Sequence, residues 1–289
     1  DSCRLIAINL YSYVVNPFTP EAYFDFDLFK VHVRKAMRLM DDLIDLEMEK
    51  IAAILKKIES DPEDEDIKRT EHDLWLKVKQ TEKHLWEKIM RKSTMGRRTG
   101  VGITAEGDML AGLGLQYGSA EAIEFAVNVQ KTLAVEAYRS SVEMAGERGP
   151  FPIYNAEKER SNPMILRIKA QDPELYEQMV KVGRRNVSML TIAPTGSVSL
   201  MTQTTSGIEP VFRPYYKRRK KVNPNDKNVN ITYKDDVGDC FEEFYVFHHH
   251  FLTWAATQGI TKEEIYKMTD DQIDALAARS PYHNASAAD

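Results

Sequence analysis

A turn rich in small and hydroxyl-bearing residues follows a short apolar run in the second half of the chain. The run, Val187–Ile192, contains several β-branched residues and favours a buried strand. A second apolar segment beyond the turn favours a helix. The turn, which we call the anion turn, consists of Ala193, Pro194, Thr195, Gly196 and Ser197.

Residues of these types in this place can bind an anion. Gly196 lets backbone N–H groups approach a ligand closely, and the hydroxyls of Thr195 and Ser197 can donate hydrogen bonds. The first amides of the following helix have no partner within that helix and point the same way. The pattern therefore predicts a phosphate site. An ordinary turn in which Ser197 caps the helix is the alternative.

A second turn of similar composition comes after the predicted helix. It consists of Thr204, Thr205, Ser206 and Gly207, and Ile208, Glu209 and Pro210 follow it. Two hydroxyl-rich turns flanking one short helix strengthen the prediction of a phosphate site.

These two turns resemble the substrate-phosphate region of the ribonucleotide reductase large subunit, especially in its adenosylcobalamin-dependent members. Asp1–Leu10 is similar to that family's Ser-Cys-x-Leu-x-x-Ile-Asn-Leu strand. Gly96–Gly102 and Gly107–Ala111 are similar to its Arg-Arg-x-Gly-x-Gly segment and the Asp-x-Leu-Ala that follows. Ser280–Ala285 is similar to a sequence segment that precedes the last third of those enzymes. The resemblance therefore extends over nearly the whole chain.

The resemblance implies a fold and a reaction. The fold is α/β, a helix-rich part of a ten-stranded α/β barrel, and residues 1–289 are the central segment of the catalytic barrel domain. The reaction is reduction of ribonucleotides to deoxyribonucleotides by radical chemistry. The substrate phosphate lies at the anion turn, and a thiyl radical removes the 3′ hydrogen. Cys3 is one of the two redox thiols, whose partner lies upstream. Adenosylcobalamin is the implied cofactor, and an external thiol reductant such as thioredoxin is an implied partner.

The radical-bearing Asn-Pro-Cys-x-Glu loop of that family does not occur in this sequence. We therefore expect the chain to be inactive alone and to assemble with the remaining reductase segments. A noncatalytic nucleotide-binding or scaffold piece is the alternative. A third possibility, an unrelated phosphate-ester enzyme on an α/β barrel, would need a general acid or a metal cluster near Thr195, and the sequence offers none there.

Composition limits the other classes of function. The chain has 289 residues, 43% of them hydrophobic, and a net charge of −5. This length suits one large domain or two smaller ones, and the charge gives no case for nucleic acid or a membrane surface as partner. No apolar run is long enough to span a bilayer, so the cytoplasm is the expected location. Two cysteines do not make a disulfide scaffold, and we expect Cys240 to be a packed, inert thiol.

The anion turn must be positioned by a mostly helical chain. An apolar stripe at intervals of three and four predicts a long helix, and an acidic connection near 60–71 and a basic hairpin or loop near 213–236 interrupt the helical pattern. Caps predict the starts of later helices at Ser119, at Asp172-Pro173, and at two capping boxes. The stripe contains Val33, Met37, Met40, Ile44, Met48, Ile51 and Leu55, and the boxes are Thr261 with Glu264 and Thr269 with Gln272.

Two other groups of residues could suggest a metal, and we predict none at either. Asp41, Asp42 and Asp45 lie within the long helix, where carboxylates at this spacing also occur on solvated faces. The adjacent histidines His248–His250 point in different directions on a helix, so they cannot share one ion. Arg97 and Arg98 are expected to fix buried carboxylates or loop carbonyls.

Overall fold

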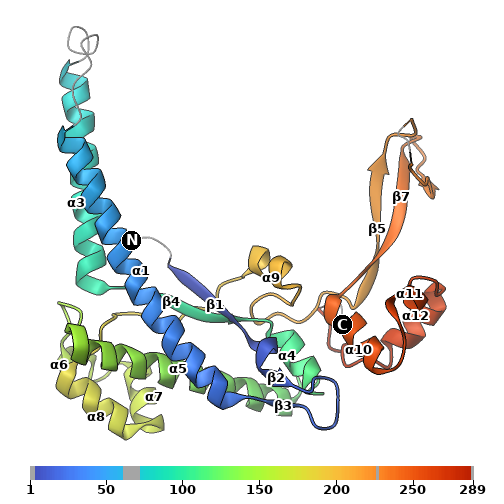
Figure 1. Ribbon diagram of the computed structural model, residues 1–289, viewed down its shortest axis with the longest axis horizontal. Helices are drawn as coiled ribbons and strands as arrows, with labels where there is room; N and C mark the ends of the chain where they lie inside the picture. Colours follow the sequence, from blue (N-terminus) through green and yellow to red (C-terminus); the bar gives the residue numbers. More distant parts are fainter. Residues whose placement is uncertain (1–3, 61–71, 226–227, 288–289) are drawn as a thin grey trace. The chain divides into compact units, whose positions relative to one another are not determined.

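The computed structural model describes residues 4–60, 72–225 and 228–287 (Figure 1). Two compact units divide the chain. The first lies within Asp1–Ile8, Phe26–Gly102 and Val129–Ala193, and the second lies within Asn9–Asp25, Ile103–Asn128 and Pro194–Asp289. Among the described helices, none is both long enough and apolar enough to cross a membrane.

The first unit is built mainly of helices. A pair of long helices, α1 and α3, lie side by side (Figure 1), and three shorter helices follow α5. The elements that lie wholly or mostly in this unit are β1 (Leu5–Asn9), α1 (Phe26–Ser60), α3 (His72–Gly96), β4 (Gly100–Thr104), α5 (Ala120–Arg148), α6 (Ala156–Glu159), α7 (Pro163–Gln171) and α8 (Pro173–Val182).

The predicted apolar stripe is the buried face of α1. Five of its seven residues are buried, and Met48 and Leu55 are half-buried. The predicted helix start at Asp172-Pro173 is also confirmed. Asp172 accepts a hydrogen bond from the Leu175 N–H, and Pro173 is the first residue of α8. The acidic connection lies outside the described residues, apart from Ser60 at the end of α1.

The sheet of the first unit is small and open. Strands β1 and β4 pair, and the extended segment before the anion turn runs parallel to β4 through a bridge between Val101 and Leu190. The Val101 N–H donates to Met189 O at 2.7 Å, and the Thr191 N–H donates to Val101 O at 3.1 Å. The predicted strand Val187–Ile192 is therefore extended and hydrogen-bonded to β4. Its pairing has the regular geometry of a β-bridge at one position, Val101 with Leu190. The helix-rich α/β prediction is confirmed, whereas the described strands do not close into a ten-stranded barrel.

The second unit combines short helices with an antiparallel hairpin. Its hydrophobic core contains Val211, Phe251, Trp254, Ile265 and Leu276. Both predicted capping boxes are present, at the starts of α11 and α12. Its elements are η1 (Leu10–Tyr13), β2 (Val14–Val15), β3 (Tyr23–Phe24), α4 (Glu106–Gly112), α9 (Gly196–Thr202), β5 (Tyr215–Val222), β6 (Tyr233–Lys234), β7 (Cys240–Phe247), α10 (His249–Thr257), α11 (Lys262–Ile265) and α12 (Asp270–Ala277).

The basic segment near 213–236, predicted as a hairpin or a loop, contributes strands β5 and β6 to a three-stranded sheet. Each of them pairs antiparallel with β7, which follows the segment. Figure 1 shows β5 beside β7. The cations of this segment face carboxylates, because Arg219 Nε lies 2.7 Å from Glu243 and Lys217 Nζ lies 2.6 Å from Asp270. These pairs are exposed to solvent and therefore contribute little to stability.

Candidate functional site

The anion turn leads directly into helix α9. Thr195 adopts a left-handed backbone with φ of 53° and starts the helix, and no side chain caps it. The Ser197 hydroxyl is exposed and has no hydrogen-bond partner among the described residues, so Ser197 is not the cap of the alternative interpretation. Gly196 is also exposed, and a Cβ added there would meet nothing within 4 Å. The first amides of α9 are thus open to a ligand.

The Thr204–Gly207 turn, which we call the second turn, is hydrogen-bonded to the anion turn. The Gly207 N–H donates to Thr195 Oγ1 at 2.7 Å, and Thr195 Oγ1 also lies 3.0 Å from Thr104 Oγ1. The Ser199 and Ser206 hydroxyls are 2.7 Å apart. The Thr195 hydroxyl oxygen therefore links the two turns, so the backbone amides and Ser197 are the open donors of the anion turn.

Residues at the start of α4 hold the second turn from the other side. The Thr205 N–H donates to Asp108 Oδ2 at 2.8 Å, and the Asp108 N–H donates back to Thr205 Oγ1 at 3.2 Å. The Ala105 N–H donates to Thr205 O, and the Glu106 N–H donates to Gly207 O. Gly107 permits this approach, because a Cβ there would lie 2.8 Å from Glu209 O.

Asp108 is a fully buried carboxylate with two further partners. His248 Nε2 lies 2.6 Å from Asp108 Oδ1, and the Tyr282 hydroxyl donates to the same oxygen at 2.8 Å. Burial alone would raise the pKa of Asp108, but the hydrogen bond to His248, the electrostatic attraction of His248 and the hydrogen bond from Tyr282 together lower it. Burial and the Asp108 charge raise the pKa of Tyr282 well above its ordinary value. Asp108 is therefore ionised and Tyr282 neutral at neutral pH.

A cavity of about 550 Å³ adjoins these groups in the second unit. Ser199, Thr205 and Ser206 contribute hydroxyl groups to its wall, and Arg213 and His248 contribute basic side chains. Volumes in this range accommodate small organic ligands. The cavity places hydroxyl and basic groups next to the second turn.

His250 is buried without hydrogen-bond partners. It is 8% exposed, and neither ring nitrogen has a partner among the described residues. Its ring centroid lies 3.8 Å from that of Tyr11. Burial lowers the pKa of His250 from 6.5 to about 4, and the Asp108 charge only partly opposes this shift. The folded protein therefore holds His250 in its neutral form.

We expect acidification from pH 7.5 to pH 4.5 to destabilise the wild-type chain more than a His250→Phe variant. In this interval the unfolded chain binds a proton at residue 250 that the folded chain excludes, so stability present above pH 6.5 is lost as the pH approaches 4. The extra loss is about 2 kcal/mol, because one pKa unit corresponds to about 1.4 kcal/mol and solvent screens part of the shift. Urea unfolding at both pH values measures it, and equal losses in the two proteins would refute the assignment.

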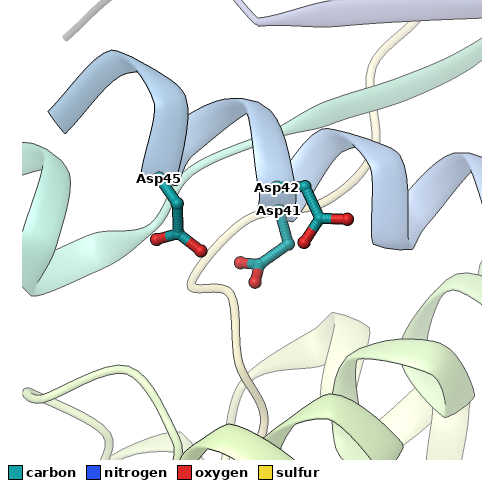
Figure 2. A group of neighbouring side chains, drawn as sticks. All are labelled: Asp41, Asp42 and Asp45. Carbon is teal, nitrogen blue, oxygen red and sulfur yellow. The ribbon is translucent and has the colours of Figure 1, made fainter. Parts of the chain in front are cut away.

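Figure 2 shows the three neighbouring aspartates of helix α1, and each accepts a hydrogen bond from an arginine. Asp41 is fully buried and accepts from Arg97 Nε at 2.8 Å and from Asn186 Nδ2 at 2.9 Å. Arg185 Nε lies 3.3 Å from Asp41 Oδ2. Asp45 accepts from Arg97, and Asp42 accepts from Arg148. These contacts explain the acidic cluster as an ion network, and they confirm that Arg97 fixes buried carboxylates.

Of the two cysteines, the structure describes Cys240. Cys3 lies outside the described residues, so its place relative to the anion turn remains a prediction. Cys240 is 8% exposed at the start of β7, and its sulfur lies 3.9 Å from Gly238 O. It is a packed thiol, as expected.

The Asp108 cluster is the feature that sequence reasoning missed. Asp108 and Tyr282 occur in segments that carry the family resemblance, and His248 belongs to the histidine triplet. Their separation along the chain is large, and one sequence does not show which distant residues pair. The signal that the sequence offered was the charge of Asp108, which stands between Gly107 and the uncharged segment Met109–Leu113.

Comparisons with known proteins agree with the resemblance. The family model described as "Ribonucleotide reductase, barrel domain" matches residues 1–279. A vitamin B12-dependent ribonucleoside-diphosphate reductase of Thermoplasma acidophilum is 29% identical over 213 residues, which are 73% of this chain and 20% of that protein. A protein of the same name from Mycobacterium tuberculosis is 33% identical over 117 residues, which are 40% of this chain and 14% of that protein.

A third relative carries a different name. A ribonucleoside-diphosphate reductase subunit alpha of Mycoplasma pneumoniae is 26% identical over 246 residues, which are 75% of this chain and 33% of that protein. The matched part is therefore a third or less of each of these three relatives. Because the family model covers nearly the full length, this chain belongs to the ribonucleotide reductase barrel-domain family.

Proposed function

We propose that this chain is a segment of a reductase catalytic subunit that binds a ribonucleoside diphosphate through its anion turn. The observation that carries the proposal is the uncapped start of α9, where Thr195 is left-handed and Gly196 and Ser197 are exposed. Membership of the reductase family supports a nucleotide as the anion, and the names of the relatives support a diphosphate. No observation favours a noncatalytic scaffold.

The phosphate is held by backbone amides and by one hydroxyl. The amides at the start of α9 donate to the phosphate oxygens, and the positive end of the helix dipole adds to the attraction. The Ser197 hydroxyl donates a further bond. Each charge-assisted hydrogen bond contributes about 1.5–3 kcal/mol. The Thr195 side chain positions the turn, since its hydroxyl oxygen already accepts from Gly207.

Cys3 supplies reducing equivalents to the bound nucleotide. Its thiol and a second thiol from another part of the enzyme together give up two electrons and two protons and become a disulfide. The ribose loses its 2′ hydroxyl as water and gains hydrogen in its place. An external dithiol, of which thioredoxin is an example, then reduces the disulfide by thiol exchange.

Cobalamin is the cofactor that the names of two relatives suggest. The two cavities of about 550 and 610 Å³ in the second unit are lined by charged, hydroxyl and aromatic side chains. Their volumes suit drug-sized ligands, whereas a corrin with its adenosyl group is larger. These cavities do not fit the cofactor, so we assign its binding to other parts of the enzyme.

A Ser197→Phe variant is expected to bind CDP at least about tenfold more weakly than the wild-type chain. The bulky ring covers the amides of α9 and removes one charge-assisted bond, which corresponds to about 1.5 kcal/mol. Isothermal titration calorimetry with CDP measures the affinity, and cytidine serves as a ligand without phosphate.

Met201→Phe is the matched control for this experiment. Met201 lies on the same helix and is 85% exposed, so the same ring there leaves the anion turn open. Its CDP affinity should equal that of the wild type. If Ser197→Phe also binds CDP with wild-type affinity, the anion turn is not the phosphate site.

A further inference from the structure

The left-handed start of α9 needs support from outside the turn. A β-branched residue with φ of 53° is strained, and such a conformation persists only where the surroundings fix it. Thr195 makes no capping bond to its own helix. Its shortest supporting bond comes from the second turn, through the Gly207 N–H that donates to Thr195 Oγ1 at 2.7 Å, and Thr104 Oγ1 lies 3.0 Å from the same oxygen.

The second turn is in turn fixed by Asp108. One carboxylate oxygen accepts the Thr205 N–H at 2.8 Å, and the Asp108 N–H donates to Thr205 Oγ1 at 3.2 Å. This reciprocal pair leaves Thr205 little freedom, and Gly207 is only two residues away. Two sets of hydrogen bonds, Asp108 with Thr205 and Gly207 with Thr195, are therefore joined by the short backbone of the second turn.

The far side of Asp108 is fixed as well. His248 and Tyr282 both bind Oδ1, so Oδ2 remains directed at Thr205. The carboxylate is fully buried and its pKa is lowered, so it stays ionised and keeps its acceptor oxygens throughout the neutral range. Hydrogen bonds to a buried charged acceptor are stronger than neutral ones. Asp108 is thus a rigid anchor.

We propose that Asp108 is a positioning residue for nucleotide binding, which holds the second turn so that this turn fixes Thr195 and directs the α9 amides at the phosphate. The inference rests on the proposed function of the anion turn. Asp108 itself does not touch the ligand. Its effect passes through Thr205 and Gly207, so removing Asp108 and removing the Thr195 hydroxyl should disable the same mechanism.

A double-mutant cycle separates this role from general packing. Asp108→Ala removes the anchor, and Thr195→Val removes the hydroxyl while keeping the β-branched shape. We expect each variant to weaken CDP binding about tenfold, and the double variant to be no weaker than either single one, because both act through one series of bonds. Thr195→Ser keeps the hydroxyl and should bind CDP more tightly than Thr195→Val. Asp108→Leu, which has a similar volume and no acceptor oxygen, replaces Asp108→Ala in the cycle if that variant does not fold.

A second readout does not depend on the ligand. Hydrogen exchange of the Gly207 amide reports its short bond to Thr195 Oγ1 at 2.7 Å together with a longer one to Thr104 Oγ1 at 3.3 Å. Loss of the short bond should make this exchange about tenfold faster in Asp108→Ala and in Thr195→Val but not in Thr195→Ser. Unchanged Gly207 exchange in folded Asp108→Ala or Asp108→Leu would overturn the inference, as would additive losses of CDP affinity. If the wild-type chain does not bind CDP but Gly207 exchange responds to Asp108, the proposed function fails, whereas the contact by which Asp108 holds the second turn is confirmed.

Discussion

An Asp41→Ala variant is expected to lose about 3–5 kcal/mol of unfolding free energy in the first unit. The Asp41 carboxylate is fully buried and accepts hydrogen bonds from Arg97, Arg185 and Asn186. Arg97 is itself only 3% exposed, and removing one carboxylate leaves its charge incompletely paired in the interior. The cost of breaking a buried ion network at one partner is of this size.

Asp42→Ala is the matched control for this prediction. Asp42 is the next residue on α1 (Figure 2). Its side chain is 46% exposed and forms an ion pair with Arg148. Because exposed pairs contribute little, the variant should lose less than about 1 kcal/mol. Urea unfolding followed by circular dichroism measures both variants. Equal and small losses would show that the Asp41 network does not stabilise the first unit.

A Gly102→Ala variant is expected to destabilise the chain by about 3 kcal/mol. A Cβ at residue 102 would lie 2.2 Å from Thr191 O, a backbone atom that cannot rotate away. The clash separates β4 from the extended segment that precedes the anion turn, and the Thr191 N–H then loses Val101 O as its acceptor. Forcing an atom into a filled site costs about 1–3 kcal/mol, with more where backbone must move.

Gly146 is the control for the Gly102 substitution. It lies in helix α5, and a Cβ added there would meet nothing within 4 Å. Gly146→Ala should therefore stabilise the chain by about 0.5–1 kcal/mol, because alanine favours the helix and restricts the unfolded chain. Thermal unfolding distinguishes the two variants by the sign of the change. A Gly102→Ala variant as stable as the wild type would contradict the close pairing of β4 with Thr191.

Local patterns predicted the helices well because their causes are local. The stripe on α1, the Asp172 cap and the two capping boxes depend on residues within a few positions of one another. The helix after the anion turn is of the same kind. Local signals were weaker for Val187–Ile192, since a strand is completed only by its neighbour, and here the pairing with β4 is regular at a single bridge.

Pairing between distant segments limited the prediction of the site. The anion turn was visible because its glycine and hydroxyl residues are adjacent in sequence. Its support was not visible, since Asp108, Thr205, His248 and Tyr282 meet only in the folded second unit. Similarly, the aspartates of α1 gave no sign that Arg97, Arg148 and Arg185 would neutralise them. The role of a buried charged residue depends on the residues that it contacts, and one sequence does not identify them.

Amide chemical shifts of the isotopically labelled chain, recorded during addition of CDP, test the central claim most directly. If the anion turn binds the nucleotide phosphate, the largest changes should occur at the amides of Gly196, Ser197 and Val198, and inorganic pyrophosphate should reproduce them. Cytidine should leave these amides unchanged. CDP-dependent changes confined to other residues, or equal changes with cytidine, would contradict phosphate binding at the start of α9.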